Sequence, residues 1–180
     1  MDDPSLARDL YRASHLRGSF TLRSGVVSNE YFDKYLFEAD PVLLGRVSDA
    51  LLPLVPDGVD AFAGLETGGI PLAVMLAQRT GLPARFVRKE AKAYGTRRLA
   101  EGGEVEGRRL LVVEDVVTSG GQLLASIRDL RERGALVSHA VCVIDREAGG
   151  PGAMRDIGVQ LRALFTMHEL ADAASGADGQ

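Results

Sequence analysis

Short apolar runs alternate with segments of helical periodicity along most of the chain. Apolar residues at helical spacing predict helices at residues 5–16, 41–54, 71–79 and 121–133. Runs of Val, Leu, Ile, Ala and Phe predict buried strands at residues 59–63, 84–88, 109–114, 137–144 and 159–165. This alternation predicts an α/β fold with a mostly parallel sheet flanked by helices. Ligands of such sheets bind beyond the carboxyl ends of the strands, so we expect the chemistry just after residues 63, 88, 114 and 144.

The two ends of the chain follow a different pattern. Residues Phe20–Leu22 and Tyr31–Phe37 predict two short strands on either side of a turn. Residues 171–180 are small and polar, so we expect a frayed tail there. Residues 90–107 are polar and contain four glycines, which predicts a mobile excursion in place of a packed element.

Composition limits the classes of function. With 180 residues, 46% hydrophobic and 26% charged, the chain fits one globular domain. Its net charge of −4 speaks against nucleic acid as a partner. No apolar stretch approaches the roughly 20 residues of a membrane span, and the N-terminus lacks a signal-peptide pattern. We therefore expect a cytoplasmic protein with no membrane partner, and we expect Cys142, which lies in an apolar run, to be a buried thiol.

The strongest motif follows the strand predicted at residues 109–114. The strand ends in Glu114 and Asp115, and the chain continues as Val116-Val117-Thr118-Ser119-Gly120-Gly121 into a helix. Backbone N–H groups at a helix N-terminus attract phosphate, and glycines let it approach closely. The two acids would repel a phosphate but suit ribose hydroxyls or a cationic transition state. The motif predicts a ribose-phosphate site, whereas the Walker and dinucleotide patterns are absent here.

This segment resembles the phosphoribosyl-diphosphate (PRPP) signature of the type I phosphoribosyltransferases. The resemblance implies the fold of that family, an α/β core with a small N-terminal hood, and PRPP as a substrate. It does not choose the base that accepts the ribose. The residues of this segment that would bind PRPP are Glu114, Asp115, Val116, Val117, Thr118, Ser119, Gly120, Gly121 and Gln122, with Asp115 also catalytic.

A second segment bears on the base. Residues 87–95, Val-Arg-Lys-Glu-Ala-Lys-Ala-Tyr-Gly, resemble the mobile catalytic loop of the orotate phosphoribosyltransferases. Three cations within five residues suit a diphosphate leaving group. By this resemblance Arg88, Lys89, Lys92 and Tyr94 would bind PRPP, and Lys92 would be catalytic.

Three further segments agree with that family. Residues 19–25 and 31–34 resemble its hood, and residues 64–71 resemble its diphosphate-binding turn, in which Thr67 and Gly68 would bind PRPP. Asp145-Arg146 follows a buried strand, where the family places an arginine near the orotate carboxylate. The residues implied in orotate binding are Thr118, Arg146 and Arg23.

The resemblance implies one phosphoribosyltransferase domain over residues 1–180, with a hood from about residues 1–40 plus C-terminal residues and a core from about 41–165. The implied reaction converts PRPP and orotate to orotidine 5′-monophosphate and diphosphate, in UMP biosynthesis. Mg²⁺ is the implied cofactor, held mainly by substrate and water with no direct protein ligand. A homodimer is implied, with the loop at residues 88–95 shared across the interface.

Two positions depart from the family pattern. Tyr94 stands where the loop commonly has histidine, and Gly68 stands where some members have lysine. Tyrosine can donate a hydrogen bond but carries no positive charge. Two alternatives stay open on the same fold, namely a phosphoribosyltransferase for another base and a non-catalytic sensor of PRPP or nucleotides. The three histidines lack metal-ligand spacing and are predicted to be structural.

Overall fold

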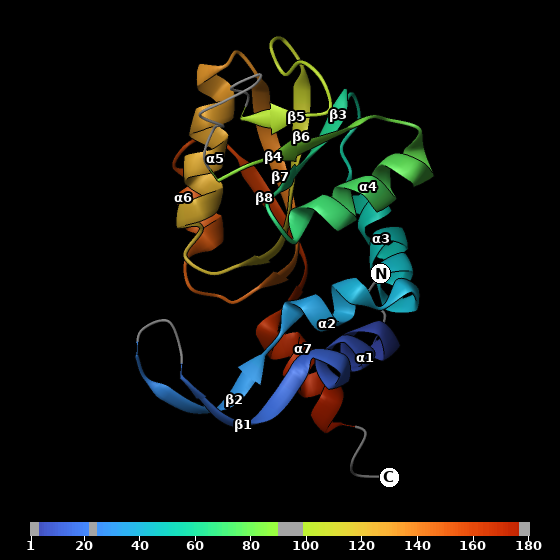
Figure 1. Cartoon of the computed structure of the whole chain (residues 1–180), viewed down its shortest axis with the longest axis vertical. Helices are drawn as coiled ribbons and strands as arrows, with labels where there is room; N and C mark the ends of the chain where they lie inside the picture. The colour runs from blue at the N-terminus through green and yellow to red at the C-terminus, as the bar shows by residue number, and fades with distance from the viewer. Residues whose placement is uncertain (1–3, 22–24, 90–98, 177–180) are drawn as a thin grey trace.

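A six-stranded sheet forms the centre of the larger part of the molecule (Figure 1). The computed structural model describes residues 4–21, 25–89 and 99–176. The strand order is β5-β4-β3-β6-β7-β8, and every neighbouring pair is parallel except β4 and β5. The strands are β3 (Ala61–Leu65), β4 (Ala84–Val87), β5 (Ala100–Glu101), β6 (Arg109–Val117), β7 (Leu136–Asp145) and β8 (Gln160–Thr166). The predicted α/β class with a mostly parallel sheet is confirmed.

Helices cover both faces of this sheet. The apolar faces of α5 and α6 pack with one set of strand residues, including Val112 and Cys142. The helices α3 and α4 pack on the opposite set, including Leu111 and Val113. Strands covered on both faces read as continuous apolar runs, which explains the pattern of the sequence. The helices are α3 (Pro41–Leu51), the 3-10 turn η1 (Leu52–Leu54), α4 (Gly69–Thr80), α5 (Gly121–Glu132) and α6 (Gly150–Arg155).

Local signals in the sequence set the helix ends. Asp40 caps α3, because its side chain accepts hydrogen bonds from the N–H groups of Val42 and Leu43, at 2.8 and 3.0 Å. Helix α4 ends at Gly81, whose φ of 75° is left-handed and favours glycine, as predicted. Among the described residues, no helix combines the length and apolar character that crossing a bilayer would need.

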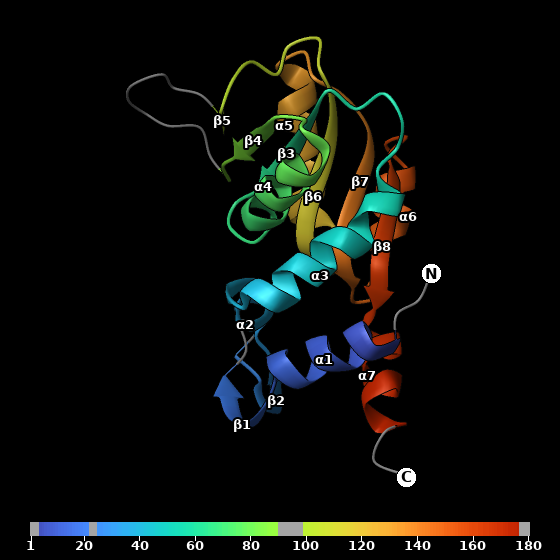
Figure 2. The ribbon, with the colours of Figure 1, turned by 90° about the vertical axis from the view of Figure 1, so that its right-hand side faces the viewer.

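A smaller unit, called the hood below, lies beside the carboxyl ends of the strands (Figure 2). It consists of α1 (Pro4–Ser14), β1 (His15–Thr21), β2 (Val27–Phe32), α2 (Lys34–Ala39) and α7 (Met167–Ser175). Strands β1 and β2 form an antiparallel hairpin, and α1 packs against α7. The predicted strand at Tyr31–Phe37 is wrong beyond Phe32, because the Asp33 side chain accepts from the Tyr35 N–H at 3.1 Å and starts a helix.

The prediction of a frayed tail is wrong for residues 171–175, which belong to α7. Thr166 and Glu169 form a reciprocal capping box at the start of this helix, in which each side chain accepts from the backbone N–H of the other residue. Leu170 is fully buried in the core cluster that also contains Leu6 and Leu10 of α1. The buried leucine fixes the helix although its neighbours are small and polar.

The predicted excursion at residues 90–107 is also wrong in part. Residues 90–98 lie outside the described residues, but Leu99 and Val105 are buried and β5 pairs with β4. The guanidinium of buried Arg85 donates to the backbone oxygen of Glu104 at 3.2 Å. Residues 99–107 therefore form a packed edge of the sheet.

Substitution of Leu170 tests whether α7 is part of the folded core. Leu170→Ala should lower the free energy of unfolding by about 2–5 kcal/mol, because it leaves a cavity in the core. The control is Leu36→Ala, which removes the same atoms from a helical leucine that is 41% exposed. Urea unfolding followed by circular dichroism measures both changes, and equal stabilities of the two variants would contradict the packing of α7.

Candidate functional site

The carboxyl ends of β3, β4, β6 and β7 meet at one edge of the sheet, as the sequence predicts. The Glu66 N–H, just after β3, donates to the Val87 oxygen at the end of β4. The Arg146 N–H, just after β7, donates to the Val117 oxygen at the end of β6. Both distances are 2.8 Å. The segments that were predicted to carry the chemistry are therefore neighbours.

The turn after β6 surrounds a cavity of about 290 Å³, called the phosphate-loop cavity below. Helix α5 begins here, and its N-cap residue Gly120 has a φ of 80° and contributes no side-chain cap. A Cβ at Gly120 would lie 3.3 Å from the Cα of Gly150, so glycine suits this turn on both counts. Uncapped N–H groups at a helix start favour an anion. The lining residues are Glu114 and residues 116–123.

The two acids of the motif point to opposite sides of β6, because side chains alternate along a strand. Glu114 lines the phosphate-loop cavity, whereas Asp115 faces α2 and α4. The Asp115 Oδ2 atom lies 2.5 Å from the Nζ atom of Lys34 in the hood, and its Oδ1 atom accepts from the Val116 N–H. From the sequence both acids were expected to face the ribose, but the structure brings only Glu114 into the cavity.

Burial and charge set the protonation of this cluster. Burial raises the pKa of Glu114 well above its usual range, and the negative charge of Asp115 adds to this effect. Burial also opposes ionisation of Asp115, but hydrogen bonds with Glu114, Glu38 and Lys34 outweigh it and hold its pKa below the ordinary value. Burial lowers the pKa of Lys34, and its contact with Asp115 more than compensates. Lys34 and Asp115 therefore form a charged pair beside Glu114, whose neutral form burial favours.

The turn after β3 packs directly on this pair. A Cβ at Gly68 would overlap the Asp115 carboxylate, and a Cβ at Gly69 would overlap the backbone oxygen of Val113. Both positions therefore require glycine for close approach. The peptide bond between Glu66 and Thr67 is cis, and Thr67 is exposed.

The cations at the end of β4 lie next to this turn. The Lys89 N–H donates to a carboxylate oxygen of Glu66 at 3.4 Å, and the Arg88 N–H donates to the Leu99 oxygen at 2.9 Å. The described part of the basic segment and the diphosphate turn are thus side by side. Lys92, Tyr94 and Arg23 lie outside the described residues.

Arg146 is exposed and lines a second cavity of about 320 Å³, shared with the hood. Thr118 lines the phosphate-loop cavity instead, so two of the three residues predicted to contact orotate, Thr118 and Arg146, line separate cavities. His15 lies in the wall of the second cavity, stacked on Tyr11 with ring centroids 4.5 Å apart. Its position there was not indicated by the sequence. The lining residues are Tyr11, His15, Ser28, Glu30, Tyr31, Phe32, Arg146, Met167 and Ala171.

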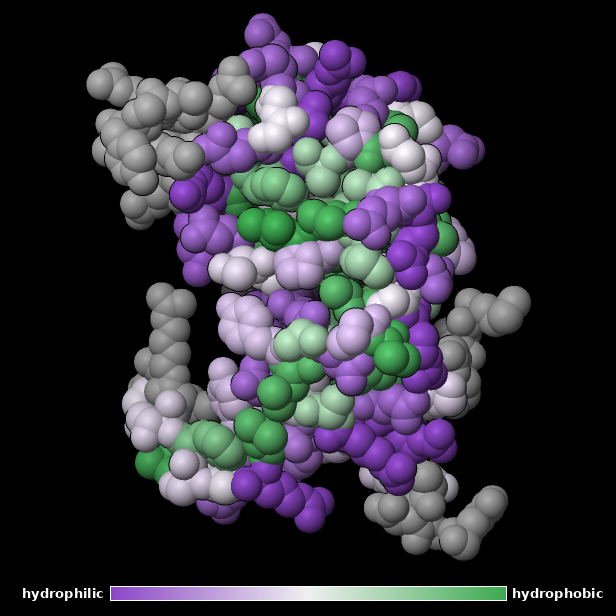
Figure 3. Space-filling model, turned by 45° about the vertical axis from the view of Figure 1, so that its right-hand side comes forward, coloured by the Kyte–Doolittle hydropathy of each residue, from purple (hydrophilic) through white to green (hydrophobic). Residues whose placement is uncertain are grey.

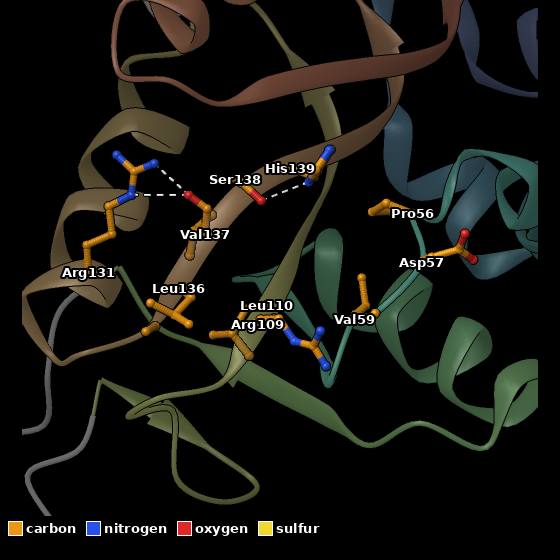
Figure 4. Close-up of a pocket in the computed structure, with 12 residues that line it drawn as sticks. Pro56, Asp57, Val59, Arg109, Leu110, Arg131, Leu136, Val137, Ser138 and His139 are labelled. Atoms are coloured by element: carbon orange, nitrogen blue, oxygen red, sulfur yellow. Dashed lines mark hydrogen bonds between the residues drawn. The ribbon is translucent and has the colours of Figure 1, made fainter.

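A third cavity, of about 450 Å³, lies at the opposite edge of the sheet, where β6 and β7 begin (Figure 4). Arg109 is bound there to the Asp60 carboxylate at 2.8 Å, and Arg131 donates to the backbone oxygens of Val137 and Ile157. Both guanidinium groups are already engaged, so this cavity offers a poorer anion site than the phosphate-loop cavity.

Two further groups bear on the chemistry. Cys142 is fully buried, and burial raises the pKa of its thiol, as expected of a structural cysteine. Among the described residues, no cluster of three or more His, Cys, Asp or Glu side chains could hold a metal ion.

No role for Lys34 or Glu38 was apparent from the sequence, although residues 31–34 were placed in the hood. A signal was present in the amino-acid usage. The chain contains 18 arginines but only three lysines, which are Lys34, Lys89 and Lys92. Two of these lysines belong to the predicted diphosphate loop, which marks the third as a candidate site residue.

Comparison with known proteins identifies the family. A family model described as a phosphoribosyl transferase domain matches residues 47–153. An orotate phosphoribosyltransferase from Nocardioides sp. is 51% identical over 172 residues, which cover 96% of each chain.

Solved structures agree with this result. The crystal structure of orotate phosphoribosyltransferase from Aeropyrum pernix matches with a TM-score of 0.82 and 34% identity, covering 97% of this chain and 99% of that chain. The enzyme of Mycobacterium tuberculosis H37Rv in complex with PRPP matches with a TM-score of 0.80 and 28% identity, covering 93% of this chain and 98% of that chain. The chain therefore belongs to the phosphoribosyltransferase family and, within it, to the orotate phosphoribosyltransferases.

Proposed function

We propose that this chain transfers the 5-phosphoribosyl group from PRPP to orotate, giving orotidine 5′-monophosphate and diphosphate in UMP biosynthesis. The observation that carries this proposal is the phosphate-loop cavity, which joins an uncapped helix start to the acid Glu114. The similarity to orotate phosphoribosyltransferases over nearly the whole chain supports orotate as the acceptor.

The phosphate-loop cavity suits the sugar half of PRPP. The N–H groups of Gly121 and Gln122, at the start of α5, can donate to the 5′-phosphate. Thr118 and Ser119 are exposed and add hydroxyl donors. Glu114, on the same side of β6, can exchange hydrogen bonds with the ribose hydroxyls.

The reaction needs no nucleophile from the protein. Orotate N1 forms a bond to C1′ of PRPP while the bond from C1′ to the diphosphate oxygen breaks. If bond breaking runs ahead, the ribose carries positive charge in the transition state, and the leaving diphosphate gains negative charge. Arg88 and Lys89, with Lys92, would stabilise the leaving group, while the phosphate loop holds the ribose in place.

We further propose Mg²⁺ as the cofactor. The carboxyl groups nearest the site are poorly suited to a protein cage, since Asp115 is already paired with Lys34 and burial favours neutral Glu114. This donor set fits an ion that is held through substrate oxygens and water. Such an ion would neutralise negative charge on the diphosphate.

We also propose a homodimer in which residues 88–95 contribute to the partner's site. Large hydrophobic side chains are exposed on and beside the hood, and Figure 3 shows hydrophobic residues on the surface of this part of the molecule. Exposed apolar groups of this kind are typical of protein interfaces. These residues are Val26, Val27, Tyr31, Tyr35, Leu36 and Val42. Sedimentation equilibrium measures the mass of the assembly and so tests the dimer. The cytoplasmic location stays a prediction.

A spectrophotometric assay decides the base. Orotate should be consumed in the presence of PRPP and Mg²⁺, and chelation of Mg²⁺ by EDTA should abolish the reaction. Uracil, adenine and hypoxanthine should react far more slowly. Consumption of another base in place of orotate would favour a different phosphoribosyltransferase, and binding of PRPP without turnover of any base would favour a sensor.

Substitution of Lys92 tests the role of the basic loop. Lys92→Ala should lower kcat by roughly 100-fold, because the transition state loses a cation that stabilises the leaving diphosphate, while orotate affinity changes little. Steady-state kinetics measure both quantities. Arg128→Ala, at an exposed position on α5, is the control for loss of a cation elsewhere. Equal losses of kcat and orotate affinity would count against this role.

Substitution of Arg146 tests the base pocket. Arg146→Ala should raise the KM for orotate by roughly 10- to 100-fold, which corresponds to one charge-assisted hydrogen bond to a carboxylate. The KM for PRPP should change much less, since Arg146 lines a different cavity from the phosphate loop. Unchanged orotate affinity would remove Arg146 from the base pocket.

A further inference from the structure

Lys34 joins the hood to the buried acid of the core. It is the first residue of α2, and its Nζ atom lies 2.5 Å from the Asp115 Oδ2 atom. The Asp115 side chain is fully buried, whereas the Lys34 side chain is 31% exposed. A buried carboxylate needs a partner to remain charged, and Lys34 of the hood provides the cation.

Glu38 lies one helical turn after Lys34 and faces the same place. It is buried, and its Oε1 atom has no hydrogen-bond partner among the described residues. A Cβ at Gly68 would overlap the Asp115 carboxylate and lie 2.6 Å from the Glu38 Oε1 atom. Lys34, Glu38 and Asp115 therefore gather over the backbone of the predicted diphosphate turn.

The charges of this cluster respond to pH. Burial, followed by the hydrogen bond and charge of Asp115, raises the pKa of Glu38 to about 8. The charged groups that face Glu38 are Lys34 and Asp33 from the hood and Asp115 from β6. At neutral pH the Glu38 carboxyl is uncharged, so Lys34 forms its ion pair with Asp115 only.

The contacts of Asp115 tie its carboxylate to both the sheet and the hood. Its Oδ1 atom accepts from the Val116 N–H, and its Oδ2 atom meets Lys34. Hydrogen bonds with Glu114 and Glu38 add to these contacts, so the fully buried carboxylate acts through its protein neighbours. Lysine suits this position, since its compact ammonium occupies one side of Asp115, whereas the wider fork of arginine would cover more of it.

We propose that Lys34 is a positioning residue for PRPP: from the hood it pairs with Asp115, and this pair holds in place the predicted diphosphate turn that packs on the Asp115 carboxylate. This inference rests on PRPP being the substrate, as proposed above. It adds helix α2 of the hood to the segments that hold PRPP. At high pH Glu38 would ionise, and its carboxylate would then compete with Asp115 for Lys34.

Calorimetric titration with PRPP and Mg²⁺ tests the inference without orotate. Lys34→Met should raise the Kd for PRPP roughly 10-fold or more, because Asp115 loses the partner that keeps it charged. The control is Arg46→Met, which removes another ion pair between the hood and the core, from Arg46 of α3 to Asp9 of α1 at 2.7 Å. An equal loss in both variants would mean that Lys34 only anchors the hood, and would overturn the inference.

A double-mutant cycle tests whether Lys34 acts through Asp115. Asp115→Asn and Lys34→Met should each weaken PRPP binding. The double variant should bind PRPP no more weakly than the single variant that has the lower affinity. Additive losses would show that Lys34 contacts PRPP independently, and would overturn the inference. The double variant leaves no unpaired buried charge. If Lys34→Met alone does not fold, Lys34→Arg takes its place in the cycle, with a smaller loss and the same non-additivity expected.

Glu38→Gln gives a readout that needs no ligand. The folded-state pKa of Glu38 is raised from 4.5 to about 8, so the folded state binds more protons than the unfolded state between these values. The contribution of Glu38 to stability is therefore present below this window and lost as pH rises through it. As pH rises through this window, the melting temperature of the wild type should fall relative to that of Glu38→Gln. If the melting temperatures of the two proteins change equally with pH, the placement of Glu38 beside Asp115 is contradicted.

The two proposals can fail separately. Unchanged PRPP affinity in Lys34→Met, with normal orotate turnover in the wild type, would end the inference and leave the proposed function intact. Absence of orotate turnover, with weakened PRPP binding in Lys34→Met, would end the choice of orotate and support the positioning role.

Discussion

The fully buried carboxylate of Asp115 is the constraint around which the two parts of the molecule are assembled. Leaving this charge unpaired in the core would cost folding free energy, and its cationic partner comes from outside the sheet. Lys34 reaches it from the hood, so the hood must lie against the carboxyl end of β6. The turn after β3 must in turn carry glycine at position 68, because the carboxylate occupies the space of a side chain there. One charge therefore fixes the approach of three segments.

Because side chains alternate along β6, Glu114 and Asp115 lie in different surroundings. Glu114 faces the phosphate-loop cavity and burial favours its neutral form, which would limit repulsion of a phosphate there. Asp115 faces the opposite side and is kept charged by Lys34. Adjacent acids in the sequence thus have opposite protonation and different neighbours.

Local patterns predicted most of the core correctly. Most strands and helices between residues 41 and 165 were predicted, because apolar periodicity and glycine signals such as Gly81 act within a few residues, but α6 and β5 were not. The helix at Lys34–Ala39 was predicted as a strand, because the apolar residues there fit both patterns over so short a span. The packing of residues 99–107 and of α7 depends on the burial of Leu99 and Leu170 against segments that are distant in the sequence. No local pattern reveals such contacts.

The sequence by itself determined the sheet, the phosphate loop and the family, because strand–loop–helix motifs keep their chemistry within one continuous segment. It also identified Arg88, Lys89 and Arg146 as candidate site residues, through the resemblance of their segments to the family. Only the tertiary structure decided that Glu114 and Asp115 face different sides, and that Lys34 and Glu38 complete the environment of Asp115. The physical reason is that pairing of a buried charge depends on distances between segments far apart in the chain, and these distances exist only after the hood has packed on the sheet.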